Sequence, residues 1–108
     1  MSEIVLALST VPSEVDSAAL ARELVSLGVA ACVTVVPAVQ SVYMWEGAVE
    51  TATEQQLLIK TTRAQVDALW AALKARHPYQ VPEFLILTIG GGNEEYLDWI
   101  RRPGGRQK

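Results

Sequence analysis

The sequence predicts a single α+β domain whose elements follow the order β-α-β-β-α-β, with one more helix at the C-terminal end. Short, continuous apolar runs, which indicate strands, alternate with segments whose apolar residues recur at helical spacing. The chain has 108 residues, half of them hydrophobic, which suits one independent core but is short of the size at which chains divide. We expect the domain to span residues 1–102, with a flexible tail at 103–108.

The first half of the chain reads as strand, helix, strand. Residues 4–8 are apolar throughout and predict a strand buried on both faces. Ser13 is expected to cap the next helix and Gly28 to end it; its apolar stripe is made by Leu20, Leu24 and Leu27. Residues 29–36 form a second apolar run, broken by Pro37, and predict a second buried strand.

The middle of the chain predicts an unusually long hairpin. Residues 39–45 alternate with strand periodicity, Glu46 and Gly47 supply a turn, and residues 48–60 can run back as the partner strand. At ~3.3 Å per residue the return strand could span roughly 40 Å, well above the usual ~17–20 Å. The half of the hairpin near the turn carries Tyr43, Met44 and Trp45. We expect this arm to pack against other subunits, because an exposed strand edge invites aggregation; the alternative is a shorter hairpin folded over its own domain.

The second half predicts helix, strand and a final helix. Thr61 or Thr62 is expected to cap the second helix, whose apolar face is made by Val66, Leu69, Trp70 and Leu73. Pro78 prevents that helix from continuing, residues 83–89 predict a last buried strand, and Asn93 is expected to cap the final helix. The complete order is the ferredoxin-like split βαβ pattern, an antiparallel sheet with helices on one face. The open face of such a sheet needs a partner, which favours an oligomer.

Composition excludes several classes of function. A net charge of −3 argues against nucleic-acid binding, which requires a clustered basic face. No apolar run approaches the length of a membrane span, and the N-terminus lacks the basic and apolar regions of a signal peptide. One cysteine cannot form an internal disulfide, so we expect a reducing, cytoplasmic environment.

The only histidine, His77, lies in a connector between a predicted helix and a predicted strand. Pro78 and Pro82 hold this connector extended, so an imidazole, the Tyr79 phenol and the Glu83 carboxylate are displayed on a stiff segment, where binding groups often lie. A neutral imidazole could bind Cu²⁺ or Zn²⁺, but one histidine is not a metal site. The alternative is an ordinary connector with a surface histidine.

Other chemically capable residues have simpler explanations. Glu50 and Glu54 share one face of the long strand and could serve acid–base chemistry, although a solvated strand face also explains them. Cys32 is expected to be a buried small hydrophobe. Lys60 is either a satisfied edge charge or an anion contact in a cleft, and residues 90–92 are a glycine hinge rather than a phosphate loop. No nucleophile–base pair is recognisable, so we expect no enzymatic activity.

The sequence resembles one known family over about residues 4–100. The matching residues are Leu20-Ala-Arg22, Ala30-Ala-Cys-Val33, Pro37, Ser41-Val-Tyr43, Trp45-Glu-Gly47, Glu54, Ile59-Lys-Thr61, His77-Pro-Tyr79, Pro82-Glu83, Tyr96-Leu97 and Trp99-Ile100. They are similar, in type and in spacing, to those of the CutA divalent-cation tolerance proteins. The resemblance implies a ferredoxin-like subunit in a compact homotrimer like that of the PII signalling proteins, with the long hairpin as trimerisation arm.

The resemblance also implies a link to copper and divalent-metal tolerance and to metal binding, without an established enzymatic reaction. The copper ligands proposed for some bacterial members are a cysteine that ends the first strand and two adjacent histidines before the Pro-Tyr pair. The corresponding residues here are Ser9, Arg76 and His77. Two of the three ligands are replaced and Arg76 repels a cation, so the resemblance implies at most a weak site for Cu²⁺ or another divalent cation at His77.

Two other functions remain open from the sequence. The first is a PII-like trimer that senses a small molecule or an anion in clefts between subunits; the residues expected to line such a cleft are Tyr43, Trp45, Lys60, His77, Tyr79 and Glu83. The second is a structural scaffold that assembles a partner protein.

Overall fold

The structure is a computed structural model that describes residues 3–102. Its strands are β1 (Ile4–Pro12), β2 (Cys32–Trp45), β3 (Ala48–Thr62) and β4 (Leu85–Thr88), and its helices are α1 (Ser17–Ser26), α2 (Val66–Arg76) and α3 (Glu94–Arg101), with a short 3-10 helix, η1 (Arg63–Gln65), before α2. This is the predicted order of elements, and it is an α+β fold. The predicted tail at 103–108 lies outside the described residues.

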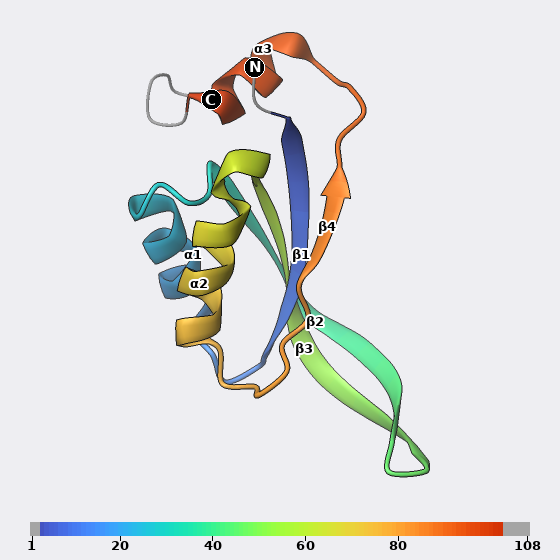
Figure 1. The fold of residues 1–108 in the computed structure, drawn as a ribbon. Coiled ribbons are helices and arrows are strands. Elements are labelled where there is room, and N and C mark those ends of the chain that lie inside the picture. The colour runs from blue at the N-terminus through green and yellow to red at the C-terminus, as the bar shows by residue number, and fades with distance from the viewer. Residues whose placement is uncertain (1–2, 103–108) are drawn as a thin grey trace.

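The four strands form one antiparallel sheet in the order β2-β3-β1-β4. Since each neighbouring pair is antiparallel, β1 and β2 run in the same direction with β3 between them, and β3 and β4 do so with β1 between them. Helices α1 and α2 pack on the same face of the sheet (Figure 1). The molecule is therefore two interleaved βαβ units in two layers, with one face of the sheet left uncovered by residues 3–102.

The core lies between the sheet and the two helices. Alternate residues of β1 and β3 face the helices, because successive side chains of a strand point to opposite faces. The fully buried members of this core are Ala7, Val11, Leu24, Leu57, Ile59, Leu69 and Leu73. A second cluster packs α3 across the end of the sheet and contains Ile4, Ala31, Leu97 and Ile100. Each such buried leucine or isoleucine contributes about 1.5–3 kcal/mol, so these two clusters fix the layers.

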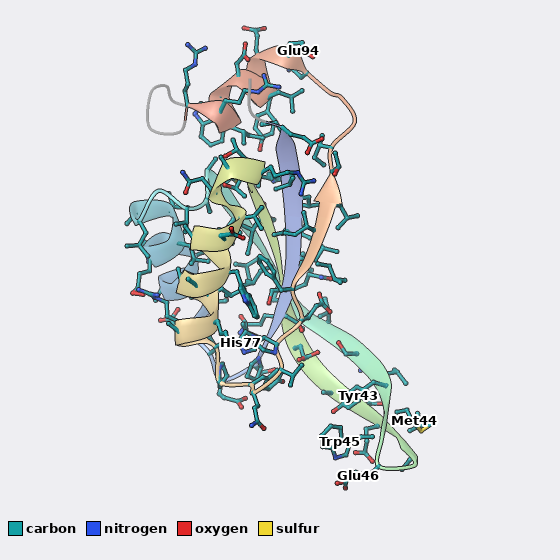
Figure 2. All side chains as sticks on the ribbon, in the orientation of Figure 1. Tyr43, Met44, Trp45, Glu46, His77 and Glu94 are labelled. Carbon is teal, nitrogen blue, oxygen red and sulfur yellow. The ribbon has the colours of Figure 1, made fainter. Side chains whose placement is uncertain are left out.

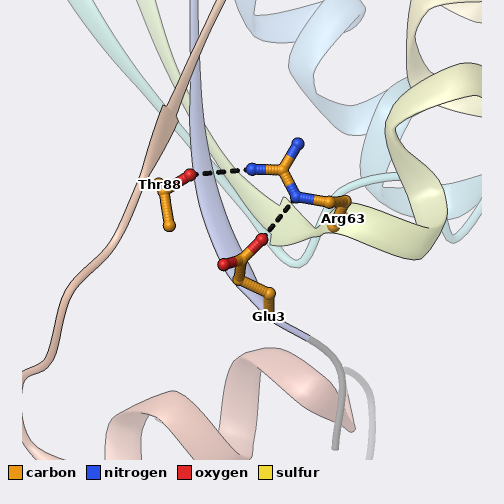
Figure 3. A network of polar contacts seen from close by, with 3 residues as sticks. All are labelled: Glu3, Arg63 and Thr88. Carbon is orange, nitrogen blue, oxygen red and sulfur yellow. Dashed lines mark hydrogen bonds and ion pairs between the residues drawn. The ribbon is translucent and has the colours of Figure 1, made fainter.

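Arg63 ties three strands together near α3 (Figure 3). It follows β3 directly, and its Nε lies 2.5 Å from Oε1 of Glu3, the residue before β1. Its guanidinium also donates a 2.7 Å hydrogen bond to Thr88 Oγ1 at the end of β4. Both ionised side chains are about half exposed. An ion pair of that kind is worth about 0–1 kcal/mol, so it adds little to the stability of the fold.

The predicted long hairpin is confirmed, and the alternative of a short hairpin folded over the domain is wrong. Residues 40–53, which we call the arm, pair only within the hairpin, because β1 stops at the pair Pro12–Glu54. Figure 1 shows the arm leaving the body of the molecule. With the arm included, the longest dimension of the molecule is 46 Å. Four apolar side chains near the tip of the arm are more than three-fifths exposed: Val42 65 %, Met44 67 %, Trp45 62 % and Val49 67 %.

The arm reverses through a two-residue turn. Glu46 has φ +47° and Gly47 has φ +80°, and the flanking Trp45 and Ala48 are paired across the hairpin. Two positive φ values define a type I′ turn, whose twist matches that of the strands it joins. Glycine adopts this conformation at no steric cost, whereas glutamate does not. The turn was predicted at the correct residues.

The second predicted strand needs correction. It was expected to be buried and to break at Pro37, but β2 begins at Cys32, continues through Pro37 and is mostly exposed. The ladder slips between Val36 and Val39, where Ala38 has φ +57°. Since β2 is at the edge of the sheet, a proline without an N–H group costs no ladder hydrogen bond on its outer side, and the slip absorbs the local distortion.

The cap of α1 was also predicted at the wrong residue. Asp16, not Ser13, is the N-cap, and its carboxylate accepts a 3.1 Å hydrogen bond from the backbone N–H of Ala19. The Ser13 hydroxyl donates instead to the carbonyl of Thr53, at 2.9 Å. The predicted helix end is confirmed, since Gly28 follows the last turn with φ +77°.

Two other caps were predicted with different success. Thr62 precedes η1 without any capping hydrogen bond from its side chain, and Thr61 donates to the carbonyl of Val29 at 2.8 Å. Gln65, rather than either threonine, precedes α2. Asn93 caps α3 as predicted, accepting a 3.0 Å hydrogen bond from the backbone N–H of Glu95.

The last strand is shorter than predicted, and its side chains are more exposed to solvent. β4 covers four residues rather than 83–89 and forms the other edge of the sheet. Ile86 packs on the core, but Leu85 and Leu87 point to the uncovered face and are 55 % and 44 % exposed. In β1, Leu6 and Leu8 point the same way and are only partly buried. Burial on both faces was therefore wrong, because this sheet has helices on one face only.

Candidate functional site

His77 is the C-cap of α2, where the backbone turns extended because Pro78 follows. Its ring is buried, with 8 % exposed, so the alternative of a surface histidine is wrong. Nε2 lies 2.7 Å from the carbonyl oxygen of Thr10, and Nδ1 accepts a 3.1 Å hydrogen bond from the backbone N–H of Tyr79. A carbonyl only accepts, so the proton of the ring is on Nε2. Since Nδ1 itself accepts a hydrogen bond, it carries no proton, and these two bonds describe the neutral imidazole.

Tyr79 connects this histidine segment to β3. Its phenol donates a 3.0 Å hydrogen bond to Oε2 of Glu54, whose side chain is buried with only 6 % of the residue exposed. Burial of the hydroxyl, followed by the Glu54 hydrogen bond and charge, raises the pKa of Tyr79 to about 12. Although 40 % of Tyr79 is exposed, the hydroxyl end faces a buried carboxylate.

Glu54 is the member of this group that sequence reasoning missed. Apart from its match to the family, it was considered only in a pair with Glu50, either for acid–base chemistry or as part of a solvated strand face. In the structure Glu50 is exposed on the arm, whereas Glu54 sits where β1, β2 and β3 last meet, opposite Pro12 and Val39. The only signal in the sequence for a role of Glu54 was its match to the family. The pairing with tyrosine could not be read from local pattern, because the two residues are 25 positions apart.

Lys60 lies apart from the group of His77, Tyr79 and Glu54. Its ammonium group donates a 3.2 Å hydrogen bond to Thr34 Oγ1 and lies 3.9 Å from the Cys32 sulfur. Cys32 is half-buried rather than fully buried as predicted. All three side chains lie on the uncovered face of the sheet, and no hydrogen bond among residues 3–102 joins Lys60 to the group of His77, Tyr79 and Glu54.

The uncovered face is mainly apolar. In register across the strands, one row contains Leu87, Leu6, Lys60 and Cys32, and the next contains Leu85, Leu8, Leu58 and Thr34. We call these eight residues the bare face. A row of leucines beside a single lysine is not an ordinary solvated surface, since an exposed apolar patch of this kind marks an interaction site.

The remaining predicted cleft residues are scattered within one chain. Tyr43 and Trp45 lie on the arm, 45 % and 62 % exposed (Figure 2), and Tyr43 is near enough to contribute to the raised pKa of Tyr79. The backbone carbonyl of Glu83 accepts a 2.8 Å hydrogen bond from the Ser9 hydroxyl, which is fully buried. One chain therefore does not form the predicted cleft, which stays a prediction about an assembly.

The residues at the expected copper positions do not fit a cation site within one chain. Both ring nitrogens of His77 are hydrogen-bonded, and the Ser9 hydroxyl is used by Glu83. Arg76 keeps its positive charge beside the position, paired with Glu23. Among residues 3–102, no group of three or more histidine, cysteine, aspartate or glutamate side chains lies close enough to hold a metal ion.

Comparison with known proteins places these features in a family. The model of the CutA1 divalent ion tolerance protein matches residues 5–103. The divalent-cation tolerance protein CutA of Thermus thermophilus is 47 % identical over 105 residues, 97 % of this chain and all of that protein. The chloroplastic protein CutA 1 of Oryza sativa is 47 % identical over 92 residues, 85 % of this chain, and the alignment spans about half of that longer protein, 52 %.

Solved structures agree with this assignment. The divalent cation tolerance protein of Thermus thermophilus superimposes with a TM-score of 0.88 at 45 % identity, covering 94 % of this chain and 99 % of that one. The protein described as the periplasmic divalent cation tolerance protein CutA of Archaeoglobus fulgidus gives a TM-score of 0.84 at 33 % identity, covering 90 % and 94 %. Within residues 3–102 no helix has the length and hydropathy needed to cross a membrane. The chain belongs to the CutA1 divalent ion tolerance protein family.

Proposed function

We propose that this chain acts in divalent-cation tolerance, including the response to copper, as a non-enzymatic homotrimer of ferredoxin-like subunits arranged like the PII proteins. The observation that carries the proposal is the bare face together with the exposed arm. Leu85, Leu87 and the arm tip leave a large apolar area in water, and apolar surface gains about 25 cal/mol per Å² when it is covered. Closed symmetry lets three copies cover one another's faces without leaving an open end.

The absence of a catalytic reaction is supported by the state of His77. A general base needs a free lone pair directed at a substrate proton. Here Nδ1 already accepts from Tyr79 and Nε2 donates to the carbonyl of Thr10. The buried ring therefore acts as a structural bridge between the connector and β1. We assign the protein to the cytoplasm on its single, unpaired cysteine, Cys32, while the Archaeoglobus fulgidus relative is described as periplasmic.

A divalent cation at His77 would be held weakly. Metal binding needs a nitrogen lone pair, so the ion would have to displace the Tyr79 N–H group or the Thr10 carbonyl. Leaving such a buried group unsatisfied costs about 1–3 kcal/mol. Titration calorimetry with Cu²⁺ and Zn²⁺ tests this: we expect weak binding that His77→Ala abolishes and that Gln80→Ala, in the same connector, leaves intact. Equal affinity of the wild type and His77→Ala would remove His77 from the proposal.

The assembly is tested by size-exclusion chromatography with light scattering. We expect a mass three times that of the 11.8 kDa chain. A monomer would overturn the trimer and the role of the arm together.

A second candidate is a PII-like trimer that senses a small molecule or anion. It is favoured by the group of His77, Tyr79 and Glu54 at the base of the arm, because Tyr43 lies nearby and a second copy could complete a cleft with Trp45, Lys60 and Glu83. A ligand that binds the folded state raises its melting temperature, so a thermal-shift screen of nucleotides and organic anions tests this candidate. No shift across the panel would count against sensing.

A further inference from the structure

A groove separate from the site above lies between α1 and the edge strand β2. Its walls are small apolar side chains, namely Ala18, Ala21 and Val25 from α1 and Val33 and Val35 from β2, and its volume is about 430 Å³. That volume is within the range of small-molecule sites. The groove is open on its outer side because β2 has no neighbouring strand there.

Among residues 3–102, Arg22 is the only charged side chain that lines this groove. Arg63, Arg76 and Arg101 each form an ion pair with a carboxylate, but Arg22 has no hydrogen-bond or ion-pair partner among residues 3–102. Its helical neighbours three and four positions away are Ala18, Ala19, Val25 and Ser26, so no carboxylate stands where an intrahelical pair would form.

The adjacent carboxylate does not supply the missing partner either. Glu23 forms an ion pair with Arg76 of α2. The groove thus combines an apolar floor with a guanidinium whose donors are all available. A guanidinium presents these donors in a planar fork that matches the two oxygens of a carboxylate.

We propose that the groove between α1 and β2 binds a small amphipathic carboxylate. The ligand's carboxylate pairs with both prongs of the Arg22 guanidinium, and its apolar body lies against Val25, Val33 and Val35. Charge complementarity selects an anion, since the lining has one positive and no negative side chain. The groove is on the helix-covered side of the sheet, because Val33 and Val35 pack toward the core. It is therefore separate from the bare face, and the inference does not rest on the proposed trimer.

The proposal is tested with 4-phenylbutyrate and octanoate as probes, on the full chain in its native assembly. Titration calorimetry measures affinity, and amide chemical shifts in a ¹⁵N-labelled sample map the contacts. We expect saturable binding, with shifts concentrated in α1 and at residues 32–36. Arg22→Gln should weaken binding at least tenfold, and the uncharged analogue 4-phenylbutanol should bind the wild type at least tenfold more weakly than 4-phenylbutyrate.

Arg102→Gln is the matched control, since Arg102 is exposed and lies outside the groove; it should bind both probes as the wild type does. Circular dichroism checks that Arg22→Gln is folded, as expected for a side chain without a partner among residues 3–102. Equal affinity of Arg22→Gln and wild type overturns the proposal. So does the absence of saturable binding of both probes, or a shift pattern that runs along the outer backbone of β2 and is kept in Arg22→Gln, which would place the probes at the strand edge rather than in the groove.

Discussion

The phenol of Tyr79 donates a 3.0 Å hydrogen bond to the buried carboxylate of Glu54. Glu54 lies where the sheet narrows from three strands to the two-stranded arm, opposite Pro12. Tyr79 comes from the connector after α2, next to His77, which bonds to Thr10 of β1. The hydrogen bond between the two residues thus fastens the connector to the base of the arm.

Tyr79→Phe should destabilise the protein by about 1–3 kcal/mol, because it leaves a buried carboxylate without its donor. Urea unfolding at a fixed protein concentration measures the change in free energy of unfolding. Tyr43→Phe is the control: Tyr43 is 45 % exposed on the arm, and a surface change of this size stays within about 0.5 kcal/mol. Equal losses for the two variants would show that the Glu54 contact contributes nothing.

The same contact predicts a dependence on alkaline pH. The native pKa of Tyr79 is raised from 10.0 to about 12, so the folded state holds this proton more tightly than the unfolded state. Its contribution to stability is fully present below pH ~10 and is lost as pH rises through ~12. The ultraviolet absorbance of tyrosinate, compared between wild type and Tyr79→Phe, should show one phenol that ionises late. A difference spectrum that titrates near the ordinary tyrosine pKa would refute this.

His77 is predicted to be the neutral tautomer with its proton on Nε2. Nitrogen NMR of the imidazole should show a protonated Nε2 and an unprotonated Nδ1, because Nε2 faces a carbonyl and Nδ1 faces an N–H group. A proton found on Nδ1 would contradict the hydrogen bonds described. His77→Ala should also cost about 1–3 kcal/mol in urea unfolding, since it leaves the Thr10 carbonyl unsatisfied, while Gln80→Ala should cost little.

Leu87→Asp should split the proposed trimer. Leu87 is 44 % exposed on the bare face of a single chain, so the monomer tolerates the charge, whereas a contact between copies would have to bury it at a cost of several kcal/mol. Light scattering should report a monomer, with native circular dichroism. Leu27→Asp provides the comparison, because Leu27 is 53 % exposed at the end of α1. If both variants remain trimeric, the bare face is not the contact surface.

Glu46→Asn should raise stability by about 0.5–1 kcal/mol. Glu46 has φ +47° in the type I′ turn of the arm, a conformation that penalises most side chains and that asparagine tolerates. Thermal unfolding measures the gain, and Glu50→Asn, on an extended strand of the same arm, should give none. Lower stability of Glu46→Asn would mean that the Glu46 side chain makes a favourable contact with another subunit.

The features that were predictable depend on local pattern. Alternation along residues 39–45 and the Glu46–Gly47 turn define the long hairpin whatever surrounds it. Pro78 stops α2 and so places His77 and Tyr79 on an extended connector without reference to other strands. The helix caps show where local pattern fails to predict the structure. Ser13 has the right chemistry for an N-cap, yet its hydroxyl donates to the carbonyl of Thr53, 40 residues away.

Burial of the strands was predicted less well, since strand order is a tertiary property. An apolar run such as residues 29–36 or 83–89 suits a central strand, but β2 and β4 occupy the two edges of the sheet. Helices cover only one face of this sheet, so the side chains on the other face point to solvent or to another copy of the chain. The predicted cleft residues separate for a related reason: Lys60 and His77 form hydrogen bonds to different partners, which the tertiary fold places apart.

The sequence by itself determined the order of elements, the length of the arm, the stiff histidine connector and the family, since each depends on residues close together in the chain. Only the tertiary structure decided that Glu54 meets Tyr79, that both nitrogens of His77 are already hydrogen-bonded, and that one face of the sheet is bare. The physical reason is that these outcomes are set by long-range pairing: a side chain's partner is whichever group the packing of the layers brings within hydrogen-bond distance.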